Sequence, residues 1–173
     1  MKKLLIINTF LFLFIAGWMF SSCSISYSFT GSSIDYTKVS SISIKDFPNI
    51  APYVYTPLSQ QFTEALKDKY TRQTKLRVLR DGGDFDLEGE ITGYNFASMA
   101  VKDGEYASQT RLTVTVRVRF TDKTSQDGDI ERSFSAYSEF SNESTIDQAQ
   151  DSACEAIIKE IVDQIFNETV ANW

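Results

Sequence analysis

"TRLTVTVRVRFTD", residues 110–122, is the stretch that decides the fold of this chain of 173 residues. Apolar and polar side chains alternate along it without a break, as is typical of a β-strand with one buried face and one face open to water. The row expected to face a core is Leu112, Val114, Val116, Val118 and Phe120. The row expected to face solvent is Arg111, Thr113, Thr115, Arg117 and Arg119.

Two more long strands are predicted on either side of this stretch. Residues 85–96 alternate up to Gly93, where the apolar positions change parity, and this indicates a β-bulge at that glycine. Residues 130–140 alternate again. The connections between the three strands are short enough for antiparallel hairpins.

The N-terminal half adds strands and a helix. Residues 37–47 alternate and predict a first strand, and residues 76–79 predict a short one. Between them a proline-rich segment ends in a helix start, with Thr56 expected as N-cap and Pro57 at the first helical position. The helical stripe that follows is Leu58, Phe62, Ala65, Leu66 and Tyr70.

A long amphipathic helix closes the chain. Thr145 is its expected N-cap, and Gln148 completes a capping box. Its stripe is Ile146, Ala149, Ala153, Ile157, Ile161 and Ile165, widened by Ile158, Val162 and Phe166. These elements predict an α+β two-layer sandwich of two helices on a four-stranded, mainly antiparallel sheet, in the order β-α-β-β-β-α.

The N-terminus has the zones of an export signal: Lys2 and Lys3, an apolar run, and small residues that end in Cys23. Cleavage before a cysteine that becomes acylated is the favoured interpretation, and an uncleaved anchor or ordinary secretion are the alternatives. We therefore expect a lipoprotein signal peptide at 1–22, a lipidated Cys23 with a tether at 23–36, and one domain at 37–173. Without the signal, which holds two lysines, 15 basic side chains remain against 23 acidic ones, a net charge of −8.

Composition excludes several functions. The acidic balance argues against a general nucleic-acid binder. Histidine is absent from the sequence, which removes most acid–base, nucleophilic and zinc chemistry. If Cys23 carries lipid, Cys154 has no disulfide partner and is expected to be a small buried apolar side chain.

Three surface features are candidate sites. Arg111, Arg117 and Arg119 could bind phosphate or carboxylate groups, or could simply pair with acids of the neighbouring strand. Tyr53 and Tyr55 could contact a partner or could cap the core beneath the first helix. The acidic run lacks the spacing of a calcium loop and is expected to be a solvated strand face; its members are Asp81, Asp84, Asp86, Glu88 and Glu90.

Several segments together resemble the LptE family of lipopolysaccharide-assembly lipoproteins. They are "CSISYSFTGSSI", "DFPNIAPYVYTPLSQQFTEALKDKY", "DLEGEITGYNFAS", "RLTVTVRVRFTD", "RSFSAYSEF" and "IIKEIVDQIFNETVANW". The resemblance implies a non-enzymatic lipoprotein without cofactor or metal, anchored in the outer membrane and inserted in the lumen of an LptD-type β-barrel. There it would support barrel assembly and the passage of lipopolysaccharide to the cell surface.

The resemblance also implies contact with lipopolysaccharide through basic side chains. Arg117 and Arg119 are the first candidates, Arg111 follows, and Lys123 and Arg132 come next. Two other hypotheses stay open at this point: a stand-alone envelope lipoprotein that binds a small hydrophobic ligand or another envelope-assembly partner, and an envelope hydrolase that uses the acidic run.

Overall fold

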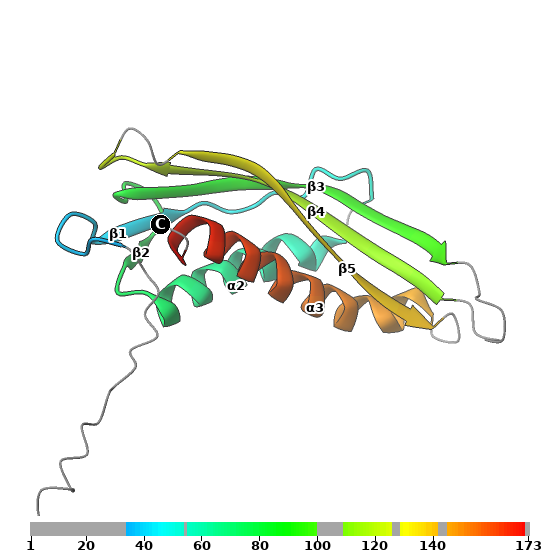
Figure 1. Ribbon diagram of the computed structural model, residues 1–173. Helices are drawn as coiled ribbons and strands as arrows, with labels where there is room; N and C mark the ends of the chain where they lie inside the picture. The colour runs from blue at the N-terminus through cyan, green and yellow to red at the C-terminus, as the bar shows by residue number, and fades with distance from the viewer. Residues whose placement is uncertain (1–33, 54, 100–108, 126–128, 142–144, 172–173) are drawn as a thin grey trace, which may run out of the picture. The chain divides into compact units, whose positions relative to one another are not determined.

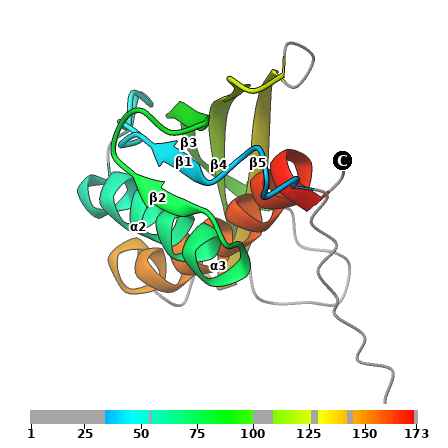
Figure 2. The same ribbon diagram turned by 90° about the vertical axis from the view of Figure 1, so that its left-hand side faces the viewer.

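A computed structural model describes residues 34–53, 55–99, 109–125, 129–141 and 145–171. The elements in chain order are β1 (Ser41–Ile44), α2 (Thr56–Gln73), β2 (Arg77–Leu79), β3 (Phe85–Met99), β4 (Gln109–Asp122), β5 (Ile130–Ser141), α3 (Ile146–Phe166) and the π-helical turn η2 (Asn167–Ala171). The strands form one sheet, and both helices cover the same face of it (Figures 1 and 2). The predicted α+β class with two helices on a sheet is confirmed.

Within the described residues the sheet has five strands in the order β2-β1-β3-β4-β5, so the prediction of four strands is wrong. The expected short strand joins the sheet at its edge as β2. β1 pairs in parallel with β2 on one side and with β3 on the other. The β1–β2 pairing is parallel because the chain crosses over through α2 between these strands.

The strands β3, β4 and β5 form the antiparallel part of the sheet, as predicted. The register of β3 against β4 shifts between Ile91 and Gly93, which confirms the expected bulge. Beyond the bulge, Tyr94 takes over the buried positions of β3. The whole apolar row of β4, from Leu112 to Phe120, is buried beneath the helices.

The helix ends differ slightly from expectation. The N-cap of α2 is Tyr55 rather than Thr56, because Thr56 already has helical backbone and Pro57 lies within the first turn. Thr145 is the N-cap of α3, and its backbone N–H donates to Oε1 of Gln148 at 3.4 Å. The C-terminal helix continues beyond Phe166 through η2.

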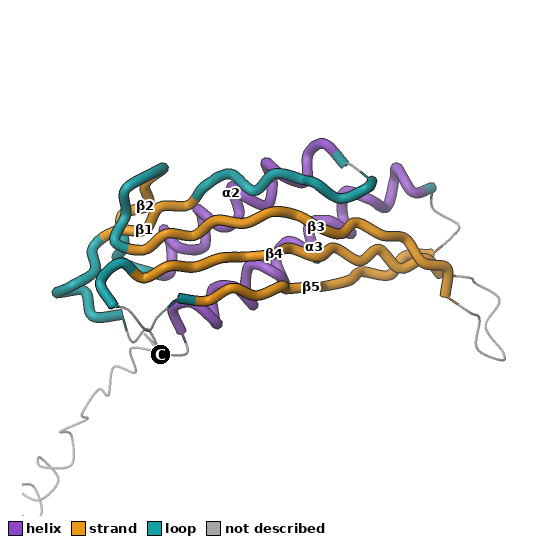
Figure 3. The backbone as a smooth tube through the Cα atoms, turned by 90° about the horizontal axis from the view of Figure 1, so that it is seen from above, coloured by secondary structure: helices purple, strands orange, loops and turns teal. Residues whose placement is uncertain are grey.

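The proline-rich segment between β1 and α2 is held against β3 (Figure 3). The N–H of Ile91 donates to Pro48 O, and the N–H of Ile50 donates to Ile91 O, both at 2.9 Å. Phe47, which is fully buried, packs on the ring of Phe62 in α2. The apolar side chains of the sheet and the helices form one core cluster in the space between the two layers.

Candidate functional site

The outer face of the sheet, away from the helices, carries most of the predicted site residues. Strict alternation in β4 places Arg111, Arg117 and Arg119 on this face, since the residues between them are buried on the other. The arginine row predicted from sequence is therefore one continuous surface along β4.

The acids of β3 pair with this row. Arg117 lies directly opposite Glu90, and its Nη1 is 3.0 Å from Oε1 of that residue. Arg119 lies opposite Glu88 at 3.9 Å, and Lys45 reaches the other oxygen of Glu88 at 2.6 Å. The pairing alternative is thus what the geometry shows, yet the two arginine side chains stay 56% and 61% exposed and can still reach a ligand.

Arg111 has a different environment at the far end of the row. Its Nη2 lies 2.6 Å from Oε1 of Glu139 on β5, and its guanidinium lies 4.2 Å from the ring centroid of Tyr137. Glu139 orients the guanidinium over the ring, which is a cation–π arrangement. Tyr137 itself is 59% exposed.

The remaining two basic candidates do not lie together. Lys123 extends the arginine row, with Nζ 2.5 Å from Oδ2 of Asp86. Partial burial alone would raise the pKa of Asp86, but hydrogen bonds from Lys123 and Ser43 and nearby positive charge outweigh it and lower that pKa. Arg132 lies opposite Val118 on the helix side of the sheet and pairs with Glu168. Sequence parity along β5 could have shown this separation.

The two candidate tyrosines differ in exposure. Tyr53 is 51% exposed and stacks on Tyr94, with ring centroids 5.5 Å apart. The Tyr55 hydroxyl donates to Asp151 of α3. That hydrogen bond, with burial and the carboxylate charge, raises the pKa of Tyr55 to about 12. Tyr53 therefore both covers the core and offers a free ring face, and its contact with a partner stays a prediction.

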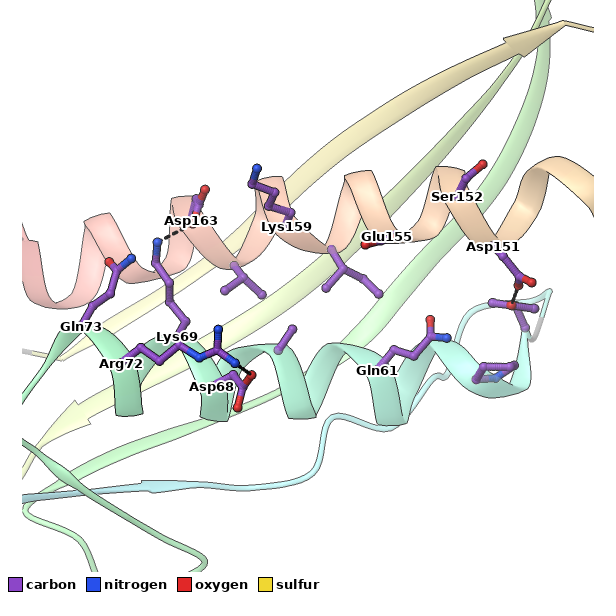
Figure 4. Close-up of a pocket in the computed structure, with 15 residues that line it drawn as sticks. Gln61, Asp68, Lys69, Arg72, Gln73, Asp151, Ser152, Glu155, Lys159 and Asp163 are labelled. Atoms are coloured by element: carbon purple, nitrogen blue, oxygen red, sulfur yellow. Dashed lines mark hydrogen bonds and ion pairs between the residues drawn. The ribbon is translucent and has the colours of Figure 1, made fainter.

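A groove of about 990 Å³ between α2 and α3 was not predicted from the sequence (Figure 4). Ala65, Ile158 and Val162 give it an apolar lining, and Lys69 pairs with Asp163 across it at 2.6 Å. One feature of the sequence could have indicated this groove. Ile158 and Val162 widen the apolar stripe of α3, so part of its apolar surface faces away from the sheet.

The acidic run has a structural role at Asp84, the residue just before β3. Oδ2 of Asp84 accepts hydrogen bonds from the backbone N–H groups of Ser40 and Ser41, at 2.8 and 3.1 Å, and from both hydroxyls. These bonds, the Ser40 N–H first, lower the pKa of Asp84. In the described part of the chain, no three His, Cys, Asp or Glu side chains are arranged to hold a metal ion.

Cys154 is a small buried side chain, as expected from the sequence. Cys154 is a free thiol, fully buried, and burial raises its pKa. Cys23, the predicted lipidation site, lies outside the described residues, as does most of the predicted tether. Of the helices that the structure describes, none has both the length and the hydropathy to cross a bilayer.

The fold and these surfaces define a two-layer α+β protein that offers a charged sheet face, an aromatic loop and an interhelical groove to other molecules. The chain belongs to the LptE family, described as lipopolysaccharide-assembly, whose family model matches residues 39–169. This membership confirms the resemblance seen in the sequence and makes the chain an envelope lipoprotein of the lipopolysaccharide-assembly type.

Solved structures with a similar fold include three bacterial proteins. A minor lipoprotein from Acinetobacter baumannii is 13% identical with a TM-score of 0.47, over 73% of this chain and 90% of that one. Protein XCC0632 from Xanthomonas campestris is 14% identical with a TM-score of 0.48, over 74% and 82%. The rare lipoprotein B from Shewanella oneidensis is 9% identical with a TM-score of 0.45, over 73% and 89%. No curated protein matches the sequence.

Proposed function

We propose that this protein is an outer-membrane lipoprotein that plugs and helps assemble an LptD-type β-barrel translocon and assists lipopolysaccharide transport to the cell surface. Membership of the LptE family over residues 39–169 is the observation that carries this proposal. Lipid on Cys23 would hold the protein at the periplasmic side of the membrane, within the barrel lumen.

The outer sheet face supports the role of a plug. A protein inside a water-filled barrel needs a complete core of its own and a polar surface toward the barrel wall. Here the core lies between the sheet and the helices, and the opposite sheet face carries paired charges and hydroxyls. The half-exposed ring of Tyr53 is suited to a partner contact, because tyrosine is enriched at protein interfaces.

The arginine row supports a contact with lipopolysaccharide. A lipid A phosphate can replace a carboxylate as the partner of a guanidinium, because both anions accept two parallel hydrogen bonds. Arg117 and Arg119 remain exposed enough for this exchange. Glu88 and Glu90 would compete with the phosphate, and this limits the affinity to a transient contact.

The hydrophobic-ligand alternative has less support. A ligand held inside the protein needs a cavity between the sheet and the helices. That space holds the buried core side chains, among them Phe47, Leu66, Ile91 and Ile161. The groove between α2 and α3 lies on the outside of the helix layer and is rimmed by charged side chains.

Purification of the native protein from membranes tests the proposed partner. Extraction in mild detergent, followed by affinity capture and mass spectrometry, should recover an outer-membrane β-barrel in stoichiometric amount. Recovery of the lipoprotein alone from membranes that contain the barrel would refute the plug role.

The lipid anchor is tested separately. We expect labelled palmitate to be incorporated into the native chain and lost completely in Cys23→Ala. Full labelling of the variant would show that the acyl group is attached elsewhere. It would also contradict the prediction of a tether at 23–36 that begins at a lipidated Cys23.

The lipopolysaccharide contact is tested by removing two guanidiniums. Arg117→Ala with Arg119→Ala should weaken lipopolysaccharide binding by about thirtyfold, since two charge-assisted contacts of on the order of 1 kcal/mol each contribute about 2 kcal/mol together. A pull-down on immobilised lipopolysaccharide measures this, with circular dichroism to verify the fold.

A matched control separates contact from repulsion. The double variant leaves Glu90 without its arginine and Glu88 with Lys45 alone, so it also makes the net charge of the face more negative. A fourfold variant that changes these two acids to alanine as well restores neutrality. Binding that returns in the fourfold variant would assign the loss to repulsion and not to arginine contact.

A further inference from the structure

One end of the domain concentrates positive charge in an otherwise acidic chain. Residues 67–80 form the end of α2, the turn that follows it and β2, and they contain six basic residues and one acidic residue, a net charge of +5. The entire chain has a net charge of −6. The exposed members of this group are Arg72, Lys75, Arg77 and Arg80, and we call them the basic end.

Most of the basic end has no acidic partner. Arg72 pairs with Asp68, but both side chains are largely exposed, at 77% and 66%, so this pair contributes little in water. Lys75, Arg77 and Arg80 have no carboxylate within 4.0 Å in the part of the chain that the structure describes. The arginines of β4, in contrast, are paired with acids of the neighbouring strands. The basic end is therefore the better prepared of the two surfaces for an external anion.

The chain enters the domain beside the basic end. Figure 2 looks onto this end, where residues 34–40 run next to β2 and the last turn of α2. The backbone N–H of Lys75 donates to the hydroxyl of Tyr36 at 3.5 Å, and its Nζ lies 5.7 Å from the centroid of the Tyr36 ring. The N–H of Arg77 donates to Ser40 O at 3.0 Å. The segment that arrives from the N-terminus thus meets the folded domain at its most basic surface.

The predicted lipid is a short length of chain away. Eleven residues, 23–33, precede Ile34, and the first of them is Cys23. A fully extended chain of this length spans at most roughly 40 Å. Lipid inserted through Cys23 therefore keeps the membrane within this distance of the basic end. At such a range, tethering makes the headgroups of that membrane the anions with the highest effective concentration.

The C-terminal helix has the opposite charge. Residues 146–171 contain six acidic residues and one lysine, a net charge of −5. An anionic surface would attract the basic end and repel this helix. The two effects favour the same orientation, with the β2 edge of the sheet toward the membrane.

We propose that the basic end binds anionic phospholipid headgroups of the membrane in which the Cys23 lipid is inserted, and that it holds the β2 edge of the sheet against that membrane. Phosphate oxygens accept hydrogen bonds from guanidinium and ammonium groups. Clustered Lys and Arg side chains next to a membrane anchor are each attracted to an anionic leaflet. This inference rests on the lipid anchor of the proposed function, but it requires neither the barrel partner nor lipopolysaccharide.

Lysine footprinting of the full lipidated chain in nanodiscs tests the proposal. One nanodisc is made of phosphatidylcholine, and the other of equal parts phosphatidylcholine and phosphatidylglycerol. A water-soluble acylating reagent labels exposed amines, and mass spectrometry measures the rate at each lysine. We expect the anionic lipid to slow labelling of Lys75 about fivefold, because several basic side chains hold it at the surface. Lys159, an exposed lysine of α3, is the internal control and should keep its rate.

Two double variants separate the basic end from general charge attraction. Arg77→Gln with Arg80→Gln should reduce the protection of Lys75 to less than about twofold. Arg117→Gln with Arg119→Gln changes the net charge by the same amount on the outer sheet face and should leave the protection intact. In about 1 M salt, where the Debye length falls to about 3 Å, the protection of Lys75 in the native chain should disappear.

Several results would each overturn the proposal. Equal rates at Lys75 in both nanodiscs would mean that the tether alone sets the position of the domain. Equal slowing of Lys75 and Lys159 would mean that no orientation is preferred, and equal loss in the two double variants would mean that only overall charge matters. Protection of Lys75 by a soluble threonine–glutamate peptide in neutral nanodiscs, as strong as that by the anionic lipid, would assign the surface to an acidic protein segment.

The failure of this inference can be told apart from a failure of the proposed function. A chain that does not assemble with either nanodisc has no lipid anchor, and this would overturn the anchor and the inference together. A chain that is anchored but leaves Lys75 accessible contradicts this inference alone. The barrel partner is tested by affinity capture, which does not depend on either nanodisc.

Discussion

Gly89 lies where β3, β4 and the ring of Phe47 approach most closely. A Cβ at this position would come 2.2 Å from Arg117 O and 2.5 Å from the Phe47 ring. The first contact is with backbone of the neighbouring strand, which cannot move aside without breaking the sheet. Glycine is therefore required here to let Phe47 cover the strand.

We predict that Gly89→Ala lowers the free energy of unfolding by about 3 kcal/mol, in the range of overpacked core positions. Gly82 is the matched control, because its φ of 75° strains any other residue but nothing lies within 4 Å of an added Cβ. Gly82→Ala should cost only about 1 kcal/mol. Urea denaturation measures both, and a Gly89→Ala value no larger than the control would contradict the close packing.

Asp84 gives the fold a sensitivity to acid. Its pKa is lowered from the ordinary value of 3.8 by the hydrogen bonds from Ser40 and Ser41. A carboxyl whose pKa is lower in the folded state stabilises that state above the unfolded pKa. This stabilisation is lost as the pH falls below about 4 and through the folded pKa.

Asp84→Asn should therefore lower the urea midpoint at pH 7 but have a smaller effect at pH 3. The amide keeps the shape of the side chain and removes the titrating group. An equal effect of the substitution at both pH values would show that Asp84 does not supply the acid sensitivity.

At the scale of elements, β4 and its two antiparallel neighbours were predictable, because one face of each is buried and the period of two is interrupted only in β3, at the Gly93 bulge that the sequence also indicates. The addition of β2 as a fifth strand was not. Its three residues carry too little pattern, and its place depends on the crossover through α2. The N-cap at Tyr55 was missed because it makes no side-chain capping bond.

The sequence predicted that the arginines of β4 lie together on one face, but it did not predict that Arg132 lies on the other face of the sheet. Alternation placed Arg111, Arg117 and Arg119 together, and the pairing of the last two with acids of β3 was an open alternative in the sequence. The pairing of Arg111 with Glu139 of β5 was not predicted. Arg132 belongs to the other face because its position in β5 has the opposite parity. The interhelical groove depends on how α2 and α3 pack together, which a single sequence does not encode locally.

The proline-rich segment before α2, which carries Tyr53 and Tyr55, is linked to α3 by the hydrogen bond between Tyr55 and Asp151. We predict that Tyr55→Phe increases amide exchange in residues 48–53 about fivefold, because the bond contributes on the order of 1 kcal/mol to local stability. Tyr53→Phe is the control, since it keeps the stacking on Tyr94. Unchanged exchange in Tyr55→Phe would mean that packing alone holds the loop.

At the scale of the whole molecule, charge is divided between two surfaces. The outer sheet face is nearly balanced, because bases of β4 and the β1 region meet acids of β3. The C-terminal helix at 146–171 holds six acidic residues and one lysine, a net charge of −5, and three of these acids, Asp151, Glu155 and Asp163, line the groove between α2 and α3. Long-range attraction of a basic partner would thus orient the protein before contact, with α3 leading.

The parallel pairing of β1 on both sides has a consequence for the order in which the chain folds. Ile42 pairs with Phe85, forty-three residues further along, whereas β3, β4 and β5 follow one another as hairpins. Closing a long loop costs more entropy than closing a hairpin. If the chain crosses a membrane starting from its N-terminus, β1 emerges before the other strands. It can nevertheless pair only after β3 has formed.

We expect pulse-labelled hydrogen exchange during refolding to protect amides of β4 before those of β1. Simultaneous protection of both strands would contradict this order. Until β3 forms, the apolar side chains of β1 remain exposed in the envelope, where a holding chaperone could bind them. Because β1 pairs late, its apolar side chains stay exposed to aggregation longer than those of β3, β4 and β5.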